Sequence, residues 1–341
     1  MNDSSNNPDS PPLNILELND ALIQTGFTDL EQAHDKASEQ AHEQFGTQAG
    51  IGSNVQLTCS VESIPVPFSS LFENASGQII WESTQEIIGT LKDLPLQTLE
   101  THAPHLKGFD WAAYLTMTAI RTLHLDRLLK QTGFNQGSLL EVGAYFGSFA
   151  LPLQRLGYRV TVIDRYTDYA EALEPFCQLM THAGIEVVKT TRQEETKQLQ
   201  QLGQFDGALA MAVIEHIPHT PKHFLEALNS HIKENGILAI DTPNLTGYWN
   251  CRKMLQGESI FQDIRQQFYT EIPFEGHHRE YTGDEIEWML KEIGLKDLIL
   301  HYFDYNMFQF EALQGQHIEC FLRMIENPRQ AGLIMCLGRK P

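Results

Sequence analysis

The 341-residue sequence is short of positive charge and of long apolar runs. It holds 24 lysines and arginines against 44 acidic residues, which gives a formal net charge of −20. Nucleic acids and anionic membrane surfaces attract concentrated positive charge, so we expect neither as a partner. No run approaches the roughly 20 apolar residues of a membrane-spanning helix.

Cysteine is also scarce, and a secretory signal is missing. The five cysteines are odd in number, far apart and never in a C-x-x-C pair, so neither a disulfide framework nor a thiolate zinc site is predicted. The opening MNDSSNNPDSPP has neither the basic start nor the apolar run of a signal peptide. These absences favour a cytoplasmic protein. Residues 1–12 have so few apolar side chains that we expect a disordered tail.

The rest of the chain divides into two regions. Residues 13–110 form an accessory region that we expect to be mainly helical, because residues 21–27 and 84–91 have helical patterns, although the sequence does not indicate its fold. A stronger helix is predicted from Trp111, because apolar side chains recur at three- and four-residue spacing until Gly133. We expect the main domain to span residues 111–341.

After residue 137, short apolar runs alternate with helical stretches, as in an α/β, Rossmann-like, mostly parallel sheet with helices on both faces. Thr220 and Pro221 predict the start of a helix that ends before Gly236, and Thr282 with Glu285 predicts a capping box. Seven strands are expected: SLLEVG, YRVTVID, GIEVVKT, FDGALAMAV, GILAIDT, LKDLILHYF and AGLIMCLGR.

The segment LLEVGAYFGSFAL, residues 139–151, has the composition of a strand, a glycine turn and a helix start. Gly143 would let the chain turn close to a ligand, and Gly147 would allow tight packing of strand and helix. Asp164 closes the second strand 23 residues after Glu141, and a carboxylate there can accept both hydroxyls of an adenosine ribose. We therefore predict a nucleoside cofactor, although two glycines and an acid also end ordinary strands.

Two adenosine cofactors fit such a turn. A nicotinamide site usually carries G-x-G-x-x-G, whereas residues 143–147 read G-A-Y-F-G. They resemble the first motif of class I S-adenosylmethionine-dependent methyltransferases, E/D-x-G-x-G-x-G, with Tyr145 in place of the middle glycine. The stretch FDGALAMAVIEHIPHTPKHFLEALNSHIKENGILAIDTPN is similar to that family's fourth strand, helix and fifth strand. Its E-H-x-x-x-P and T-P-N motifs are similar to those of ubiquinone-biosynthesis-type small-molecule methyltransferases.

The resemblance covers about residues 137–244 and the closing strand pair, and it implies the seven-stranded methyltransferase fold with S-adenosylmethionine as cofactor. The acid that the family carries after the third strand is replaced by TTRQEET, which leaves Thr191 and Arg192 beside Gln193 as candidates for the adenine contact. By the family pattern, the cofactor-binding residues are Glu141, Gly143, Ala144, Tyr145, Gly147, Asp164, Arg165, Gln193 and Ala212.

Methyl transfer is an in-line displacement at a sulfonium, so the protein mainly aligns the nucleophile and, where needed, removes its proton. Glu215 and His216 end the fourth strand, and an imidazole suits the role of proton acceptor. With His278 they are the catalytic candidates, although the pair equally suits a structural anchor of the following turn. A metal held by histidines such as His216, His219, His277 and His278 fits the composition, but no spacing is diagnostic, and none is predicted.

The long connection after the fifth strand, residues 245–281, is rich in aromatic side chains with interspersed basic ones. Such a composition suits a small-molecule pocket, so we predict a lid over the acceptor. The alternative is that the aromatics form the core of the lid while Arg279 and Tyr281 position the next helix. The predicted acceptor-binding residues are Tyr248, Trp249, His277, His278, Arg279 and Tyr281.

The sequence thus predicts a methyltransferase that acts on a small molecule, with oxygen favoured as the methylated atom. The alternatives are a nonmethylating enzyme or a cofactor-binding regulatory module on the same fold, and an NAD-dependent oxidoreductase. The acceptor, the pathway and the oligomeric state are left open.

Overall fold

The structure is a computed structural model that describes residues 72–92, 94, 109–169, 171–270, 274–304, 323 and 326–341. The tail predicted at residues 1–12 and most of the accessory region lie outside these residues. Within them, every helix is too short or too polar to cross a membrane.

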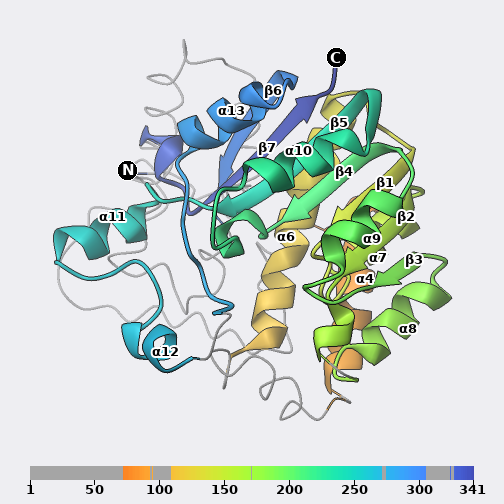
Figure 1. Ribbon diagram of the computed structural model, residues 1–341, viewed down its shortest axis with the longest axis horizontal. Helices are drawn as coiled ribbons and strands as arrows, with labels where there is room; N and C mark the ends of the chain where they lie inside the picture. Colours follow the sequence, from red (N-terminus) through yellow and green to blue (C-terminus); the bar gives the residue numbers. More distant parts are fainter. Residues whose placement is uncertain are drawn as a thin grey trace, which may run out of the picture.

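A seven-stranded sheet forms the centre of the molecule, in the order β3-β2-β1-β4-β5-β7-β6 (Figure 1). Strands β1 to β5 pair in parallel, whereas β7 runs antiparallel to its neighbours β5 and β6. All seven predicted strands are confirmed, as is the fold class. The strands are β1 (Ser138–Val142), β2 (Arg159–Asp164), β3 (Glu186–Lys189), β4 (Phe205–Met211), β5 (Ile232–Pro243), β6 (Lys296–Phe303) and β7 (Leu333–Arg339).

Helices cover both faces of the sheet. Side chains alternate along a strand, so Leu139 joins the core on one face and Leu140 the core on the other. One face carries α4 (Ala75–Lys92), α6 (Trp111–Gln131), α7 (Ala150–Arg155) and α8 (Glu174–His182). The other carries α9 (Glu195–Gln201), α10 (Lys222–Ser230) and α13 (Gly283–Glu292). Helix α4 comes from the accessory region and packs against α6 and α7, so that region contributes to the core of the main domain.

The boundaries of α10 differ from the prediction. Pro221, not Thr220, is the N-cap, and the Thr220 hydroxyl accepts a hydrogen bond from the N–H of the first helical residue. The predicted extension of the helix to Gly236 is wrong, because Gly236 lies inside β5. Ile232 already pairs with Phe205 of β4, and pairing between strands overrides the helical pattern of the intervening residues.

Two other predicted helix starts are confirmed. Helix α6 begins at Trp111, where the Asp110 side chain accepts a hydrogen bond from the Ala113 N–H. Helix α13 begins with the capping box of Thr282 and Glu285, in which each side chain accepts from the other residue's N–H. These caps fix the start of each helix, and α13 follows directly on the segment that reaches the site.

The connection after β5 has two distinct parts. Helices α11 (Tyr248–Leu255) and α12 (Ile264–Tyr269) extend away from the layered core (Figure 1). Phe268 and Tyr269 on α12 are 76% and 80% exposed. Residues 274–281, which we call the strap, return to the sheet. Short 3-10 turns span Tyr166–Tyr169, Ile214–His216 and Pro328–Gln330.

Candidate functional site

The predicted cofactor and catalytic residues gather at one edge of the sheet. Strand order reverses at β1, which lies between β2 and β4. In an open α/β sheet, ligands bind in the crevice beyond the carboxyl ends of the strands at such a point. The glycine turn follows β1, Asp164 ends β2, and Glu215 and His216 follow β4.

The two glycines of the turn are required by both conformation and space. Gly143 has a φ of 79°, and a Cβ there would lie 2.7 Å from a γ-methyl of Val213. Gly147 has a φ of 74°, and its Cβ would lie 2.5 Å from the sulfur of Met180 in α8. A side chain at either position would strain the backbone and collide with a neighbour. Gly143 thereby brings the glycine turn against the turn after β4.

Tyr145 stands where the family motif has its middle glycine, and it adopts the left-handed backbone conformation that glycine favours. Its φ is 48°, in the left-handed region that costs a residue with a side chain about 1–2 kcal/mol. Its N–H donates a 2.7 Å hydrogen bond to the Asp164 carboxylate. Its ring packs against Trp111 and Tyr169, with centroid separations of 5.8 and 5.5 Å. These contacts offset the strain, so the turn survives without its middle glycine.

Two buried carboxylates face this turn. The two oxygens of Asp164 accept hydrogen bonds from the N–H groups of Tyr145 and Arg165, at 2.7 and 2.6 Å. Burial raises the pKa of Asp164, and these two hydrogen bonds oppose the rise. Burial and the charge of Asp164 raise the pKa of Glu141 to about 8. Oε2 of Glu141 has no hydrogen-bond partner among the described residues, so a bound group can satisfy it.

A buried ion pair that sequence reasoning missed lies beneath the edge. Arg121 on α6 donates through Nε and Nη2 to the two oxygens of Asp241 on β5, each at 2.7 Å. Oδ1 of Asp241 also accepts the N–H of Ala212, which has a φ of 55°. The pair therefore fixes the start of the turn after β4. The partners lie 120 residues apart, and no local pattern indicates such a contact.

Glu215, His216 and His277 form a cluster beyond β4, with one ligand atom from each lying within 4.8 Å of the others. Glu215 is fully buried, and burial raises its pKa to about 7 against the opposing charge of His277. Its Oε2 accepts a 3.1 Å hydrogen bond from the Thr242 hydroxyl, whereas Oε1 has no partner among the described residues. The His216 and His277 rings are 4.8 Å apart.

Both histidines of the cluster have their tautomer set by a neighbour. His216 Nδ1 lies 2.9 Å from the Glu275 carbonyl oxygen, and His277 Nδ1 lies 3.3 Å from the Glu280 carboxylate. These oxygens only accept, so Nδ1 carries the proton and Nε2 the lone pair of each neutral ring. Burial, followed by the charge of His277, lowers the pKa of His216 to about 4. Burial also acts to lower the pKa of His277, but Glu280 and Glu215 raise it overall.

Backbone hydrogen bonds attach the strap to the turn after β4. The Glu215 carbonyl oxygen accepts the N–H groups of His278 and Arg279, at 2.7 and 3.4 Å. His278 turns its Nε2 back to the Phe274 carbonyl oxygen at 3.1 Å, so its ring lies outside the cluster. The Arg279 side chain forms an exposed ion pair with Glu285 of the capping box. This contact matches the bracing role that the sequence left open for Arg279.

The strap also reaches the ends of β2 and β3. Glu275 forms ion pairs with Arg165, at 3.0 Å, and with Arg192. Gln193, the predicted adenine contact, is exposed to solvent. The strap therefore crosses the edge from the turn after β4 to the predicted ribose and adenine positions. Glu275 was not among the residues predicted from the sequence. Its partners Arg165 and Arg192 lie 110 and 83 positions earlier in the chain, and no local pattern indicates such distant contacts.

The predicted acceptor residues are not all near the cluster. Tyr281 is 3% exposed and belongs to the hydrophobic core, so its place is structural. Tyr248 and Trp249 lie at the start of α11 and contact each other, with ring centroids 5.1 Å apart. Asn250 beside them donates a 2.6 Å hydrogen bond to Glu280, which also contacts His277. Glu280 thus connects α11 to the cluster.

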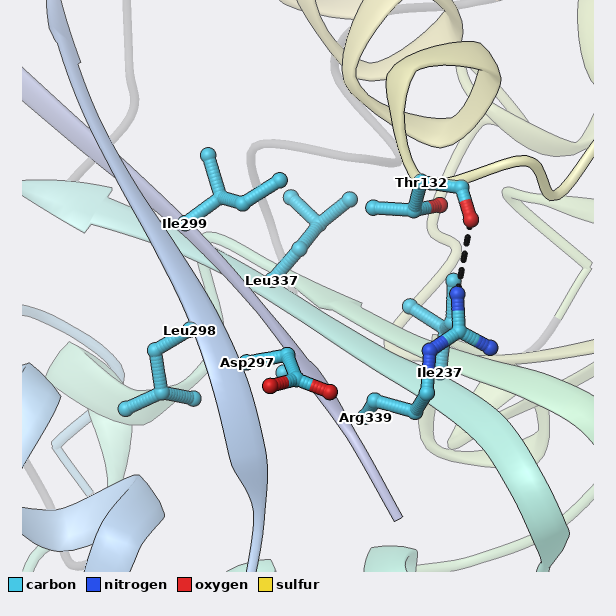
Figure 2. Close-up of a pocket in the computed structure, with 8 residues that line it drawn as sticks. Thr132, Ile237, Asp297, Leu298, Ile299, Leu337 and Arg339 are labelled. Atoms are coloured by element: carbon cyan, nitrogen blue, oxygen red, sulfur yellow. Dashed lines mark hydrogen bonds between the residues drawn. The ribbon is translucent and has the colours of Figure 1, made fainter. Parts of the chain in front are cut away.

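A cavity of about 390 Å³ lies elsewhere, between the end of α6 and strands β5, β6 and β7 (Figure 2). Arg339 there donates a 2.7 Å hydrogen bond to the Thr132 carbonyl oxygen. Ile237 in its wall pairs beside Gly207 near the start of β4, so the cavity opens at the amino end of the parallel strands. It contains none of the predicted site residues, and we place the candidate site at the carboxyl ends.

Comparison with known proteins matches a domain that contains the predicted site residues. A family model for a methyltransferase domain matches residues 116–300, more than half of the chain. The ubiquinone biosynthesis O-methyltransferase of Colwellia psychrerythraea is 29% identical over 122 residues, which cover 36% of this chain and 48% of that protein. The enzyme of the same name from Rickettsia typhi is 33% identical over 108 residues, covering 32% and 42%. The chain thus spans about half the length of the curated relatives it matches.

Solved structures of two methyltransferases are also similar. A SAM-dependent methyltransferase from Archaeoglobus fulgidus aligns over 65% of this chain and 94% of its own, with a TM-score of 0.44 and 16% identity. Magnesium protoporphyrin IX methyltransferase from Synechocystis with bound SAH aligns over 65% and 82%, with a TM-score of 0.41 and 14% identity. The domain match spans the glycine turn, Asp164 and the turn after β4, and the chain belongs to the class I S-adenosylmethionine-dependent methyltransferases.

Proposed function

We propose that this chain transfers the methyl group of S-adenosylmethionine to an oxygen atom of a small-molecule acceptor. The observation that carries the proposal is the contact of the glycine turn with the turn after β4. The Cβ position of Gly143 lies 2.7 Å from Val213, two residues before Glu215. A methyl donor held by the glycine turn would therefore lie beside the cluster of Glu215, His216 and His277.

Oxygen is the favoured atom for two reasons. The curated relatives are named O-methyltransferases. The cluster also offers two imidazole lone pairs and a carboxylate, groups that accept a hydrogen bond from a hydroxyl and polarise it. In the transfer, an acceptor oxygen lone pair forms the new C–O bond while the C–S bond breaks and its electron pair remains on sulfur. The hydroxyl proton passes to a basic group of the cluster or to water. The sulfonium is already a good leaving group, so the main task of the protein is to align oxygen, carbon and sulfur.

We assign the cofactor to the residues that line the ends of β1, β2 and β4. Asp164 is the residue to test, because its carboxylate would accept the ribose hydroxyls. Asp164→Ala should weaken the binding of S-adenosylhomocysteine by about 2–4 kcal/mol, roughly 30- to 700-fold, since two charge-assisted hydrogen bonds are lost. Isothermal calorimetry measures this change. Glu234→Ala, at an exposed position at the other end of the sheet, is the control.

Unchanged affinity in Asp164→Ala would reject this cofactor site. Calorimetry with NAD on the same sample tests the nicotinamide alternative. The acceptor atom is tested by incubating the chain with isotope-labelled S-adenosylmethionine and a panel of small hydroxyl, amine and thiol compounds. We expect label in methyl ethers. Label confined to nitrogen or sulfur products would overturn the assignment to oxygen.

A further inference from the structure

We propose that Glu215, His216 and His277 bind one divalent transition-metal ion, and that this ion holds the acceptor oxygen. The ion's role rests on the proposed function, whereas the site itself rests on the geometry of the three side chains. One ligand atom from each already lies within 4.8 Å of the others. The 3-10 turn after β4 supplies two of them and the strap the third, so the site forms only when the strap is docked.

The hydrogen bonds of the two histidines match those of metal ligands. A ligating histidine usually donates its other ring N–H to a carboxylate or a backbone carbonyl, which orients the ring. His216 Nδ1 lies 2.9 Å from the Glu275 carbonyl oxygen, and His277 Nδ1 lies 3.3 Å from the Glu280 carboxylate. Both partners come from the strap. Nε2 of each ring is therefore the atom that carries a lone pair for an ion.

The carboxylate of the cluster is incomplete without a further partner. Glu215 is fully buried, and its Oε1 has no hydrogen-bond partner among the described residues. A buried polar atom left unpaired is costly, and native structures satisfy nearly all of them. Its other oxygen is fixed by the Thr242 hydroxyl at 3.1 Å, the kind of support that ligating carboxylates receive. A cation between Oε1 and the two imidazoles supplies the missing partner.

The ligand set indicates the class of ion. Two imidazoles and one carboxylate suit Zn²⁺, Fe²⁺ or Mn²⁺, whereas Mg²⁺ and Ca²⁺ prefer oxygen ligands alone. Metal–ligand bonds of about 2.0–2.2 Å place ligand atoms roughly 3–3.5 Å apart. The ligand atoms lie within 4.8 Å of one another, so binding would shorten their separations by up to roughly 1.3–1.8 Å. His278 directs its ring to the Phe274 carbonyl oxygen and His219 is exposed, so neither belongs to the set. Three protein ligands leave open positions for water and the acceptor.

Coordination gives the acceptor hydroxyl a route to lose its proton. A bound cation lowers the pKa of a coordinated water to about 7, and it lowers the pKa of a coordinated hydroxyl in the same direction. The proton goes to bulk water. The oxygen lone pair then forms the C–O bond, and the C–S pair stays on sulfur. His216 is in this case a ligand rather than a general base.

The test is metal binding by the full chain after removal of bound ions with a chelator. Calorimetric titration should show one Zn²⁺ or Mn²⁺ per chain and much weaker binding of Mg²⁺. Co²⁺ should give the visible absorption of a nitrogen-ligated ion. His277→Asn and Glu215→Gln should each weaken Zn²⁺ binding by more than about 100-fold, the upper end of the loss caused by removing a mere supporting partner. His219→Asn, which changes an exposed histidine outside the set, should leave it unchanged.

Each variant is also checked for folding by thermal melting and for S-adenosylhomocysteine binding without metal. The proposal is overturned if the unaltered chain binds no stoichiometric ion, or if folded His277→Asn and Glu215→Gln chains bind Zn²⁺ as tightly as the unaltered chain. Failure of metal binding with intact S-adenosylhomocysteine binding rejects the metal site alone. If the unaltered chain does not bind S-adenosylhomocysteine, the proposed function is rejected instead.

Discussion

The two halves of the strand-end edge are held in place by different means. In the half that we propose holds the cofactor, called the cofactor half (residues 141–147 and 164–165), backbone conformation and close packing set the shape, as at Gly147 against Met180. In the acceptor half, residues 212–216 and the strap, hydrogen bonds and ion pairs join side chains far apart in the sequence, as at Glu275. The cofactor half should therefore be sensitive to added volume, and the acceptor half to lost charge.

Among single substitutions, breaking the buried ion pair that fixes the start of the turn after β4 should have the largest effect. Arg121→Met removes the bidentate partner of Asp241 and leaves a buried carboxylate unpaired, at a cost of about 3–5 kcal/mol in the free energy of unfolding. Urea denaturation measures the loss. Arg279→Met breaks an exposed ion pair and should cost less than about 1 kcal/mol. Equal losses of unfolding free energy in the two variants would show that the buried pair stabilises the protein no more than an exposed ion pair does.

Added volume tests the cofactor half. Gly147→Ala should destabilise the fold by about 2–4 kcal/mol, because the new methyl group adds left-handed backbone strain and overpacking against Met180. Gly257→Ala is the matched control, since Gly257 has a similar φ of 77° but no atom within 4 Å of its Cβ position. The difference between the two melting curves isolates the packing effect. Identical destabilisation would mean that conformation alone requires glycine at residue 147.

A change of pH should act through a third site, the buried pair of His124 on α6 and His301 on β6. Burial lowers the pKa of His301 to about 3, and burial together with the charge of His301 lowers that of His124 well below the usual value. Their rings are joined by a 2.8 Å hydrogen bond. The unfolded chain protonates these two imidazoles at a higher pH than the folded chain does. The stability that depends on the neutral rings is therefore complete above about pH 6.5 and is lost as the pH falls towards 3, by about 1.4 kcal/mol per pH unit for each ring.

Urea denaturation from pH 7 to 4 measures this loss. His301→Gln should reduce its slope by the share of one histidine, whereas His219→Gln, at an exposed position, should leave the slope unchanged. If the slope in His301→Gln equals that of the unaltered chain, other titratable groups cause the acid sensitivity. The pH dependence of each half of the edge would then have to be measured separately.

The same contrast explains what the sequence could predict. The seven strands, the glycine turn and Asp164 follow from patterns only a few residues long, so apolar periodicity and strand ends suffice to locate them. The cluster joins Glu215 to His277, 62 residues later, and its shape depends on how the strap docks. No local spacing indicates such a contact. Helix α10 was extended too far because strand pairing at Ile232 overrides the local helical pattern.

The aromatic insertion shows the same limit. Its composition predicts a lid, yet Phe268 and Tyr269 on α12 are exposed, and the polar strap lies against the site. Composition identifies the kind of surface that a segment offers but not which part of it docks. The predicted role of Tyr248 and Trp249 in acceptor binding stays a prediction, and their substitution by alanine should lower turnover more than cofactor affinity.

Loss of charge on the strap should have the smallest effect and gives the sharpest comparison. Glu275→Gln removes the anion that pairs with Arg165 and Arg192, both partly exposed, so the loss of stability should be at most about 1 kcal/mol. About 1 M salt should reduce it further, because screening already weakens such pairs. Glu287→Gln on α13, which breaks another exposed pair, is the control.

Hydrogen exchange then separates the halves in the Glu275→Gln chain. The amide of His278, bonded to the Glu215 carbonyl oxygen, should exchange faster as the strap loosens. The amide of Tyr145, bonded to Asp164 in the glycine turn, should keep its protection, because backbone conformation and packing hold that turn without the strap. Faster exchange at both amides would show that the strap also stabilises the cofactor half, and the division of the edge into two independently held halves would fail.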